Sequence, residues 1–294
     1  MRTLWSISVL ACGLLLLPST CLAVESPSLM ERFSQVSRGA HYEPPSMEAF
    51  EQARKTFLEM FVNQHIPCDK LKSLGFRIVR MPLKNESWVI IEDALHRGAG
   101  LYAVRSEPKQ GVPLLLQAPH SFFDRYTREL AVQWMQEGGV TAVAWNTTHR
   151  YQLDDGRSDV AHQDISFFQA FMLAFAEAYP SGGIIQLHGF SSEKRRDSDA
   201  ASADVILSNG TLHASVIIKR IDDCLDDLLV GASRVFPDEV GELGATSNRN
   251  ARALRAIGFE GFVHVEMSQA LRKKLSDVWF LRNRFVRCIE GGWR

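Results

Sequence analysis

The sequence predicts an α/β fold built on a doubly wound sheet. From residue 112 onward, short apolar runs typical of strands alternate with longer segments of helical periodicity, which is the pattern of strands connected through helices. Three of the apolar runs lead into a polar side chain suited to chemistry, namely His120, His188 and Glu266. Because open α/β sheets place ligands and catalytic groups at the C-terminal ends of their strands, we expect these three side chains to gather at one edge of the sheet.

The part of the chain before residue 112 is expected to supply an edge of that sheet. Residues 24–45 are polar and contain three prolines, so they are predicted to form an extended lead-in. Ser46 has the character of an N-cap, and apolar residues recur at helical spacing after it. Short strand-like runs follow at 76–80, 88–91 and 100–104, and their close spacing indicates an antiparallel or mixed edge.

The alternating part accounts for the remaining elements. Strands are predicted at 112–117, 140–145, 183–187, 203–207 and 261–266, with helices near 125–137, 164–178, 213–230, 247–257 and from there to the end. The simplest division is a signal peptide over 1–23, an N-terminal extension with a helix over 24–60, and one α/β domain over 61–294.

The composition excludes several classes of protein. Of the 294 residues, 46% are hydrophobic and 23% are charged, as in ordinary globular proteins. The net charge of −1 gives no indication of a nucleic-acid partner. The sequence contains neither the GxSxG turn of serine hydrolases, nor the GxGxxG and Walker A phosphate motifs, nor the HExxH of thermolysin-like peptidases.

The N-terminus predicts a secreted or periplasmic protein. Arg2 precedes a short apolar core at 10–17, and small residues end at Ala23, as in a cleavable signal peptide too short to span a membrane. A lipoprotein signal at Cys21 is the less favoured alternative, because the residues before it make a poor lipobox. In the mature chain Cys68, Cys224 and Cys288 allow at most one disulfide among themselves, and the sequence leaves the pairing open.

The residues at the predicted strand ends have the composition of a catalytic zinc site. His120, Glu129 and His188 would supply two imidazoles and one carboxylate, with a fourth position left for water. Glu266 would be the additional carboxylate that accepts and donates the proton. His264, two residues earlier on the same strand face, would lie beyond the metal ligands and help to orient them. A buried strand that ends in a carboxylate is costly unless the charge is paired or bound to a metal.

Each of these residues also has an ordinary structural explanation. His120 would cap a loop, and Glu266 would pair with Arg272. Glu129 would form a surface ion pair, since it lies beside Arg128 and four residues after Arg125. The joint pattern favours the functional interpretation, because unrelated polar residues need not all fall at the C-terminal ends of strands.

Further polar residues are candidates for holding a substrate. Arg195 and Arg196 lie just beyond His188, where a guanidinium would bind a carboxylate with two hydrogen bonds. Asn146 follows a predicted strand. A second group lies near the start of a predicted helix, which is a favourable place for an anion, and consists of Asn248, Arg249 and Arg252.

The sequence resembles zinc-dependent amidohydrolases and carboxypeptidase-like exopeptidases. The resemblance lies in Ala118–His120, Glu129, Gln186–Gly189 and Val265–Met267. The nearest in character are poly-gamma-glutamate hydrolases, N-formylglutamate amidohydrolases and N-acetylmuramoyl-L-alanine amidases. The resemblance covers residues 112 to 270 and implies a three-layer α/β/α fold with a mixed, mostly parallel sheet, of the zinc exopeptidase (phosphorylase/hydrolase-like) type. It departs from the family pattern in the Ser121–Asp124 turn and in the nine-residue step from His120 to Glu129.

The resemblance implies a secreted zinc-dependent hydrolase that cleaves an amide bond in a peptide, gamma-glutamyl or cell-wall peptide substrate. By its pattern Zn²⁺ would be held by His120, Glu129 and His188, with Glu266 as the general base. One alternative is a non-catalytic secreted protein that binds peptides or wall fragments on the same fold, and another is an inactive relative in which the same residues form ion pairs. A binding protein would not need Glu266 in addition to three metal ligands.

Overall fold

The computed structural model describes residues 28–37, 41–83 and 86–294. The predicted signal peptide lies outside these residues. Among them, no helix is both long enough and apolar enough to cross a membrane.

The described residues form an α/β fold around one mixed nine-stranded sheet, as predicted. The strands lie in the order β1-β2-β3-β5-β4-β6-β9-β7-β8. Four pairings are parallel, β5 with β4, β4 with β6, β6 with β9, and β7 with β8, and four are antiparallel. Parallel pairing therefore occupies the centre of the sheet, and an antiparallel meander of β1, β2 and β3 forms the edge that the closely spaced runs predict. The strands are β1 (Phe76–Leu83), β2 (Glu86–Asp93), β3 (Leu101–Arg105), β4 (Leu114–Ala118), β5 (Ala142–Trp145), β6 (Gly183–Phe190), β7 (Val205–Ser208), β8 (Ser233–Val235) and β9 (Phe262–Ser268).

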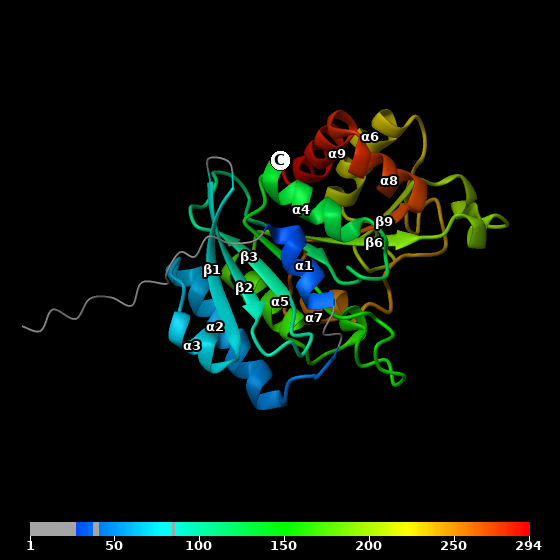
Figure 1. Cartoon of the computed structure of the whole chain (residues 1–294). Coiled ribbons are helices and arrows are strands. Elements are labelled where there is room, and N and C mark those ends of the chain that lie inside the picture. Colours follow the sequence, from blue (N-terminus) through cyan, green and yellow to red (C-terminus); the bar gives the residue numbers. More distant parts are fainter. Residues whose placement is uncertain (1–27, 38–40, 84–85) are drawn as a thin grey trace, which may run out of the picture.

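Helices cover both faces of the sheet, so the molecule has three layers (Figure 1). One face carries α2, α5 and α7, and the other carries α4, α6, α8 and α9. The helices are α1 (Leu29–Ser37), α2 (Met47–Asn63), α3 (Cys68–Ser73), α4 (Thr127–Glu137), α5 (Phe167–Ala178), α6 (Val216–Leu229), α7 (Arg249–Ala256), α8 (Gln269–Asp277) and α9 (Trp279–Gly291). Short 3-10 turns lie at Val160–His162, Glu193–Arg195 and Asp199–Ser202.

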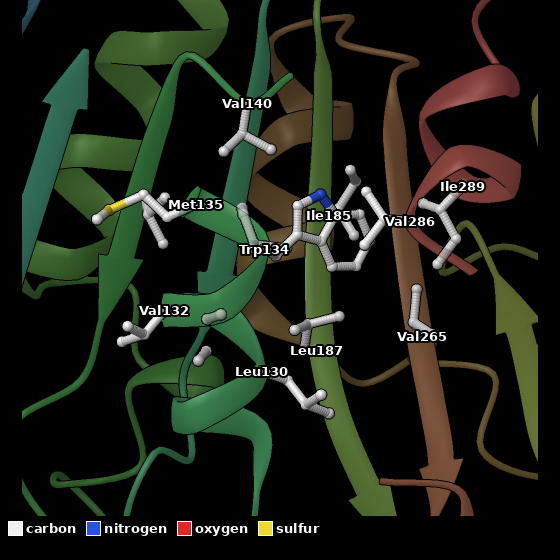
Figure 2. Packing of buried hydrophobic residues seen from close by; sticks show 14 of the residues in the cluster. Leu130, Val132, Trp134, Met135, Val140, Ile185, Leu187, Val265, Val286 and Ile289 are labelled. Carbon is white, nitrogen blue, oxygen red and sulfur yellow. The ribbon is translucent and has the colours of Figure 1, made fainter. Parts of the chain in front are cut away.

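The central strands are buried on both faces, and most of their residues are apolar, because each face packs against helices. On one side, Leu130 and Trp134 of α4 and Val286 and Ile289 of α9 pack over β6 and β9 (Figure 2). On the other side, aromatic rings of α2 and α5 pack together, as in the edge contact of Phe57 with Phe171, whose centroids are 5.0 Å apart. Helix α2, which the sequence predicts after Ser46, thus packs directly on α5.

The expectation of an extended lead-in over residues 24–45 was wrong for its middle part, where α1 forms. Ser28 and Glu31 make a capping box: the Glu31 amide donates to the Ser28 hydroxyl at 3.3 Å, and the Ser28 amide donates to the Glu31 carboxylate at 2.6 Å. Leu29 and Phe33 are buried, and the Phe33 ring meets Trp145 edge-on at 5.4 Å. The polar composition of this segment outweighed the helical signal of its capping box.

The C-terminal helices are fixed covalently as well as by packing. Cys224 of α6 and Cys288 of α9 form a disulfide across 64 residues of sequence. This disulfide settles which pair is joined among Cys68, Cys224 and Cys288, and it links α6 to α9 covalently.

Candidate metal centre

The parallel strands β4, β6 and β9 bring the three predicted side chains to one edge of the sheet. His188 of β6 lies directly opposite Glu266 of β9 in the register. His120 follows the end of β4 by two residues, and its ring meets the His188 ring edge-on with the centroids 4.7 Å apart. All three side chains are buried, so the site lies inside the edge of the sheet rather than on an outer surface.

One group of three ligand side chains could hold a metal ion, and it consists of His120, Asp124 and His188. The Asp124 Oδ2 atom lies 3.1 Å from His120 Nδ1 and 3.6 Å from His188 Nδ1. Ligand atoms bound tetrahedrally to zinc at about 2.1 Å lie about 3.4 Å from one another. The spacing of these donor atoms therefore fits a zinc ion, and the donor set of two imidazoles and one carboxylate is one that catalytic zinc uses.

The outer nitrogen of each histidine is held by a second side chain. His120 Nε2 lies 2.9 Å from the Asp159 carboxylate, and His188 Nε2 lies 2.9 Å from the Gln186 amide oxygen. An oxygen acceptor at Nε2 keeps the proton there and leaves the Nδ1 lone pair directed at the shared centre. Hydrogen bonds of this kind orient histidines that bind metals and strengthen them as ligands.

The two histidines differ in their electrostatics. Burial acts to lower the pKa of His120, but its hydrogen bonds to Asp124 and Asp159 outweigh burial and the pKa is raised. Burial, reinforced by the neighbouring His264 and His120, lowers the pKa of His188 well below its ordinary value. His188 is therefore neutral near pH 7, as a metal ligand must be. A metal would have to displace the proton from His120.

Glu266 is a buried carboxylate without a compensating partner among the described residues. Its Oε2 atom is buried and accepts no hydrogen bond from the described part of the chain, and its other oxygen lies 3.8 Å from His264 Nε2, beyond hydrogen-bonding distance. Burial, and then the nearby charge of Asp124, raises the pKa of Glu266 to about 8. Such a carboxyl group takes up and releases a proton near neutral pH, which suits a general base or acid.

The ion pair of Glu266 with Arg272, the structural explanation considered from the sequence, does not form. The Arg272 guanidinium donates to three backbone carbonyls, those of Arg125 at 2.6 Å, Met267 at 3.2 Å and Phe190 at 3.4 Å. It packs so closely against Gly189 that a β-carbon there would lie 2.2 Å from the Arg272 Cζ atom. Arg272 therefore holds the loops around the site together rather than neutralising Glu266.

His264 stands behind His188 and next to Glu266. Its ring centroid is 4.5 Å from that of His188, burial lowers its pKa to about 3, and its Nδ1 atom is buried without a hydrogen-bond partner in the described chain. His188, His264 and Glu266 also lie close enough together to form a second set of possible ligands. The two sets share His188, whose Nε2 is engaged with Gln186.

A buried network of side-chain amides supports the histidines from the α5 and α7 face. The Gln186 oxygen accepts from Asn248 Nδ2 at 2.7 Å as well as from His188. Its nitrogen donates to Gln117 and to Asn250, both at 3.0 Å, and Asn250 in turn donates to Gln169. Because every polar group of Gln186 is satisfied, the ring of His188 has one defined orientation.

Glu129 is the predicted ligand that the structure does not bring to this centre. Its carboxylate pairs with Arg128 at 2.7 Å, and its side chain is 30% exposed. Asp124 lies there instead, because the chain turns back after β4: the Asp124 amide donates to the His120 carbonyl at 2.8 Å. The structural explanation of Glu129 as a surface ion-pair residue is therefore confirmed, with Arg128 as its partner.

The predicted substrate-binding residues are dispersed. Arg195 is close enough to influence Glu266, and its guanidinium pairs with Glu242 at 3.2 Å. Arg196 and Arg252 are exposed, and Arg249 pairs with Asp164 at 2.6 Å. Asn248 is buried, caps α7 and donates to Gln186. Its amide therefore helps to hold Gln186, the hydrogen-bond partner of His188.

Asn146 is also buried, and its side-chain nitrogen has no hydrogen-bond partner among the described residues. Asp124, Asp159 and Gln186 are the site residues that sequence reasoning missed. A signal existed for two of them: Asp124 follows His120 by four residues, one turn, and Gln186 precedes His188 by two, on the same face of one strand. Asp159 lies 39 residues from His120, and no local pattern connects the two.

The chain has distant similarity to several solved structures. No protein-family model matches the sequence, and neither does any curated protein. Among solved structures, an N-formylglutamate amidohydrolase from Ralstonia eutropha is 13% identical, with 66% of this chain and 97% of that chain covered and a TM-score of 0.45. A succinylglutamate desuccinylase from Vibrio parahaemolyticus is 12% identical, with 80% of each chain covered and a TM-score of 0.43. An aminopeptidase from Legionella pneumophila is 9% identical, with 95% of this chain and 80% of that chain covered and a TM-score of 0.43. These similarities are distant, so the function proposed for this chain rests on its own site.

Proposed function

We propose that this protein is a secreted zinc-dependent hydrolase that cleaves an amide bond in a peptide, gamma-glutamyl or cell-wall peptide substrate. The observation that carries the proposal is the convergence of His120, Asp124 and His188 beside the buried carboxylate of Glu266. Each histidine has its outer nitrogen engaged and its inner nitrogen turned toward Asp124. Ion pairs alone would not require this arrangement.

Each residue of the site would have a separate role in hydrolysis. When bound, zinc supplies a Lewis acid that acidifies water and polarises a carbonyl group. Glu266, with its pKa raised to about 8, would accept a proton from the attacking water at its free oxygen and pass it to the leaving amine. Asp159 and Gln186 would keep the histidines oriented. The buried position of the site would exclude bulk water from the reaction.

Two parts of the proposal rest on the sequence. Secretion is supported by the signal-like pattern of residues 1–23. The amide-bond chemistry is supported by the resemblance of the strand-end motifs to zinc amidohydrolases, with one change: the carboxylate ligand is assigned to Asp124 in place of Glu129.

The first experiment is metal analysis of the purified mature protein and of three variants. We expect about one zinc per wild-type chain, loss of the metal in Asp124→Ala and His188→Ala, and retention in Glu129→Ala, the matched control. Zinc lost in Glu129→Ala and kept in Asp124→Ala would restore the ligand set predicted from the sequence. No metal in wild-type protein refolded with zinc would overturn the hydrolase proposal.

Activity separates the hydrolase from the binding-protein alternative. Glu266→Gln keeps the shape of the side chain but cannot accept the proton, so it should retain zinc and lose hydrolysis of wall peptides or gamma-glutamyl polymers by about 10²- to 10⁴-fold. A zinc-loaded wild-type protein that binds these substrates without cleaving any of them would establish the binding protein instead.

A further inference from the structure

Three aromatic rings contact one another beside the candidate metal centre. They are Phe123, His149 and Tyr151, and we refer to them as the aromatic cluster. The Phe123 side chain is 46% exposed and that of Tyr151 is 63% exposed. Phe123 directly precedes Asp124, and the other two residues follow β5 in the next strand-end loop. The cluster is thus built by two loops at the same edge of the sheet as the site.

Phe123 contacts the other two rings of the cluster edge to face. The centroid of Phe123 is 5.5 Å from that of His149, with an interplanar angle of 78°, and 5.2 Å from that of Tyr151, with an angle of 86°. His149 and Tyr151 are 5.8 Å apart. These are favourable aromatic geometries, so the cluster has a defined shape although it is exposed.

Arg150 connects the cluster to the metal centre. Its guanidinium carbon lies 5.4 Å from the Phe123 centroid and 5.3 Å from the Tyr151 centroid. The same guanidinium bonds to the Asp159 carboxylate and lies 3.2 Å from His120 Nδ1. A group bound on the aromatic cluster would therefore be next to the ligands of the candidate metal.

An exposed set of packed apolar rings next to a site is a common mark of a binding surface. The Phe123 ring is nearly perpendicular to the other two rings, so the cluster does not form one flat platform of the kind a sugar ring would lie on. The ring edges and faces that Arg150 does not cover are available to a further ring. Arg150 lies over Phe123 and Tyr151 and is neutralised by Asp159, so the cluster does not select a free anion.

We propose that the aromatic cluster binds an aromatic side chain of the substrate, adjacent to the amide bond that is cleaved. This inference rests on the proposed function and specifies it further: the substrate would be a peptide-type amide with an aromatic residue next to the scissile bond. Phe123 and Tyr151 would then determine specificity, while the metal ligands and Glu266 would act on the bond itself.

The test measures binding to the metal-free protein, so that its result does not depend on zinc or on activity. The probes are N-acetyl-L-phenylalaninamide and N-acetyl-L-alaninamide, titrated into the full mature chain with EDTA and followed by NMR. We expect the phenylalanine probe to bind about tenfold more tightly than the alanine probe. Phe123→Ala and Tyr151→Ala should each remove most of that difference, and Leu212→Ala, an exposed apolar residue elsewhere, should leave it unchanged.

Two results would overturn the inference. One is a phenylalanine probe that binds no more tightly than the alanine probe, or that binds Tyr151→Ala and wild type equally. The other is tight binding of N,N′-diacetylchitobiose in place of the phenylalanine probe, which would make the cluster a glycan platform. Failure of the metal analysis would refute the proposed hydrolase separately, since probe binding is measured without zinc.

Discussion

The buried carboxyl group of Glu266 should make the metal-free protein less stable as the pH rises. Its pKa is about 8 in the folded protein against an ordinary value of 4.5. Below pH 4.5 the group is protonated in both the folded and unfolded states and costs nothing. Between the two values the unfolded chain releases the proton while the folded chain keeps it, so folding loses stability as the pH rises, and the loss is complete above pH 8.

The size of this effect follows from the two pKa values. Each pKa unit corresponds to about 1.4 kcal/mol, so the rise of the Glu266 pKa represents a loss of stability on the order of 5 kcal/mol at pH 9 relative to pH 4. The side chain is 11% exposed, so solvent screening reduces this figure little. Glu266→Gln removes the titration and keeps the shape. The substitution also changes packing and hydrogen bonding, but the effect of these changes on stability is independent of pH.

The assay is urea unfolding of wild type and Glu266→Gln at pH 5, 7 and 9 in EDTA. The free energy of unfolding of the variant, relative to wild type, should rise by several kcal/mol between pH 5 and pH 9. Added zinc should reduce the difference, because a cation beside Asp124 favours the ionised carboxylate. Glu129→Gln, which changes a partly exposed carboxylate, is the control and should show no comparable trend. A difference between Glu266→Gln and wild type that stays constant from pH 5 to pH 9 would refute the reasoning.

Three further predictions test other parts of the structure. Asp159→Asn weakens the hold on His120 Nε2 and should lower zinc affinity by about 10- to 100-fold, measured by competition with a chelator; unchanged affinity would mean that Asp159 does not orient the ligand. Gln186→Met leaves His188, Asn248, Gln117 and Asn250 each short of a buried hydrogen bond and should destabilise the protein by about 3 kcal/mol or more, seen as a lower urea midpoint; a loss under 1 kcal/mol would show that the network rearranges. The double variant Cys224→Ala, Cys288→Ala opens a loop of 64 residues and should lower the free energy of unfolding by about 2–4 kcal/mol, measured by urea unfolding under oxidising conditions; a urea midpoint equal to that of wild type would contradict it.

Much of the fold was predictable from local patterns. The alternation of apolar runs with helical segments predicted most of the strands and helices, because the central strands β4, β6 and β9 are almost wholly buried and each contains a short apolar run. The capping box of Ser28 and Glu31 was present in the sequence but was outweighed by the polar composition around it. The short strand β8 carried too few residues for any periodicity.

The sequence by itself determined that His120, His188 and Glu266 would share one edge of the sheet, because parallel strands place their C-terminal ends on the same side. Only the tertiary structure decided that Asp124 completes the group and that Glu129 does not, since the choice depends on how the chain turns between β4 and α4. It also decided that Asp159 and Gln186 hold the two histidines and that Phe123 meets Tyr151. These contacts join side chains from separate loops and strands, and their geometry follows from the order of β4, β6 and β9 in the sheet, which no local pattern in the sequence encodes.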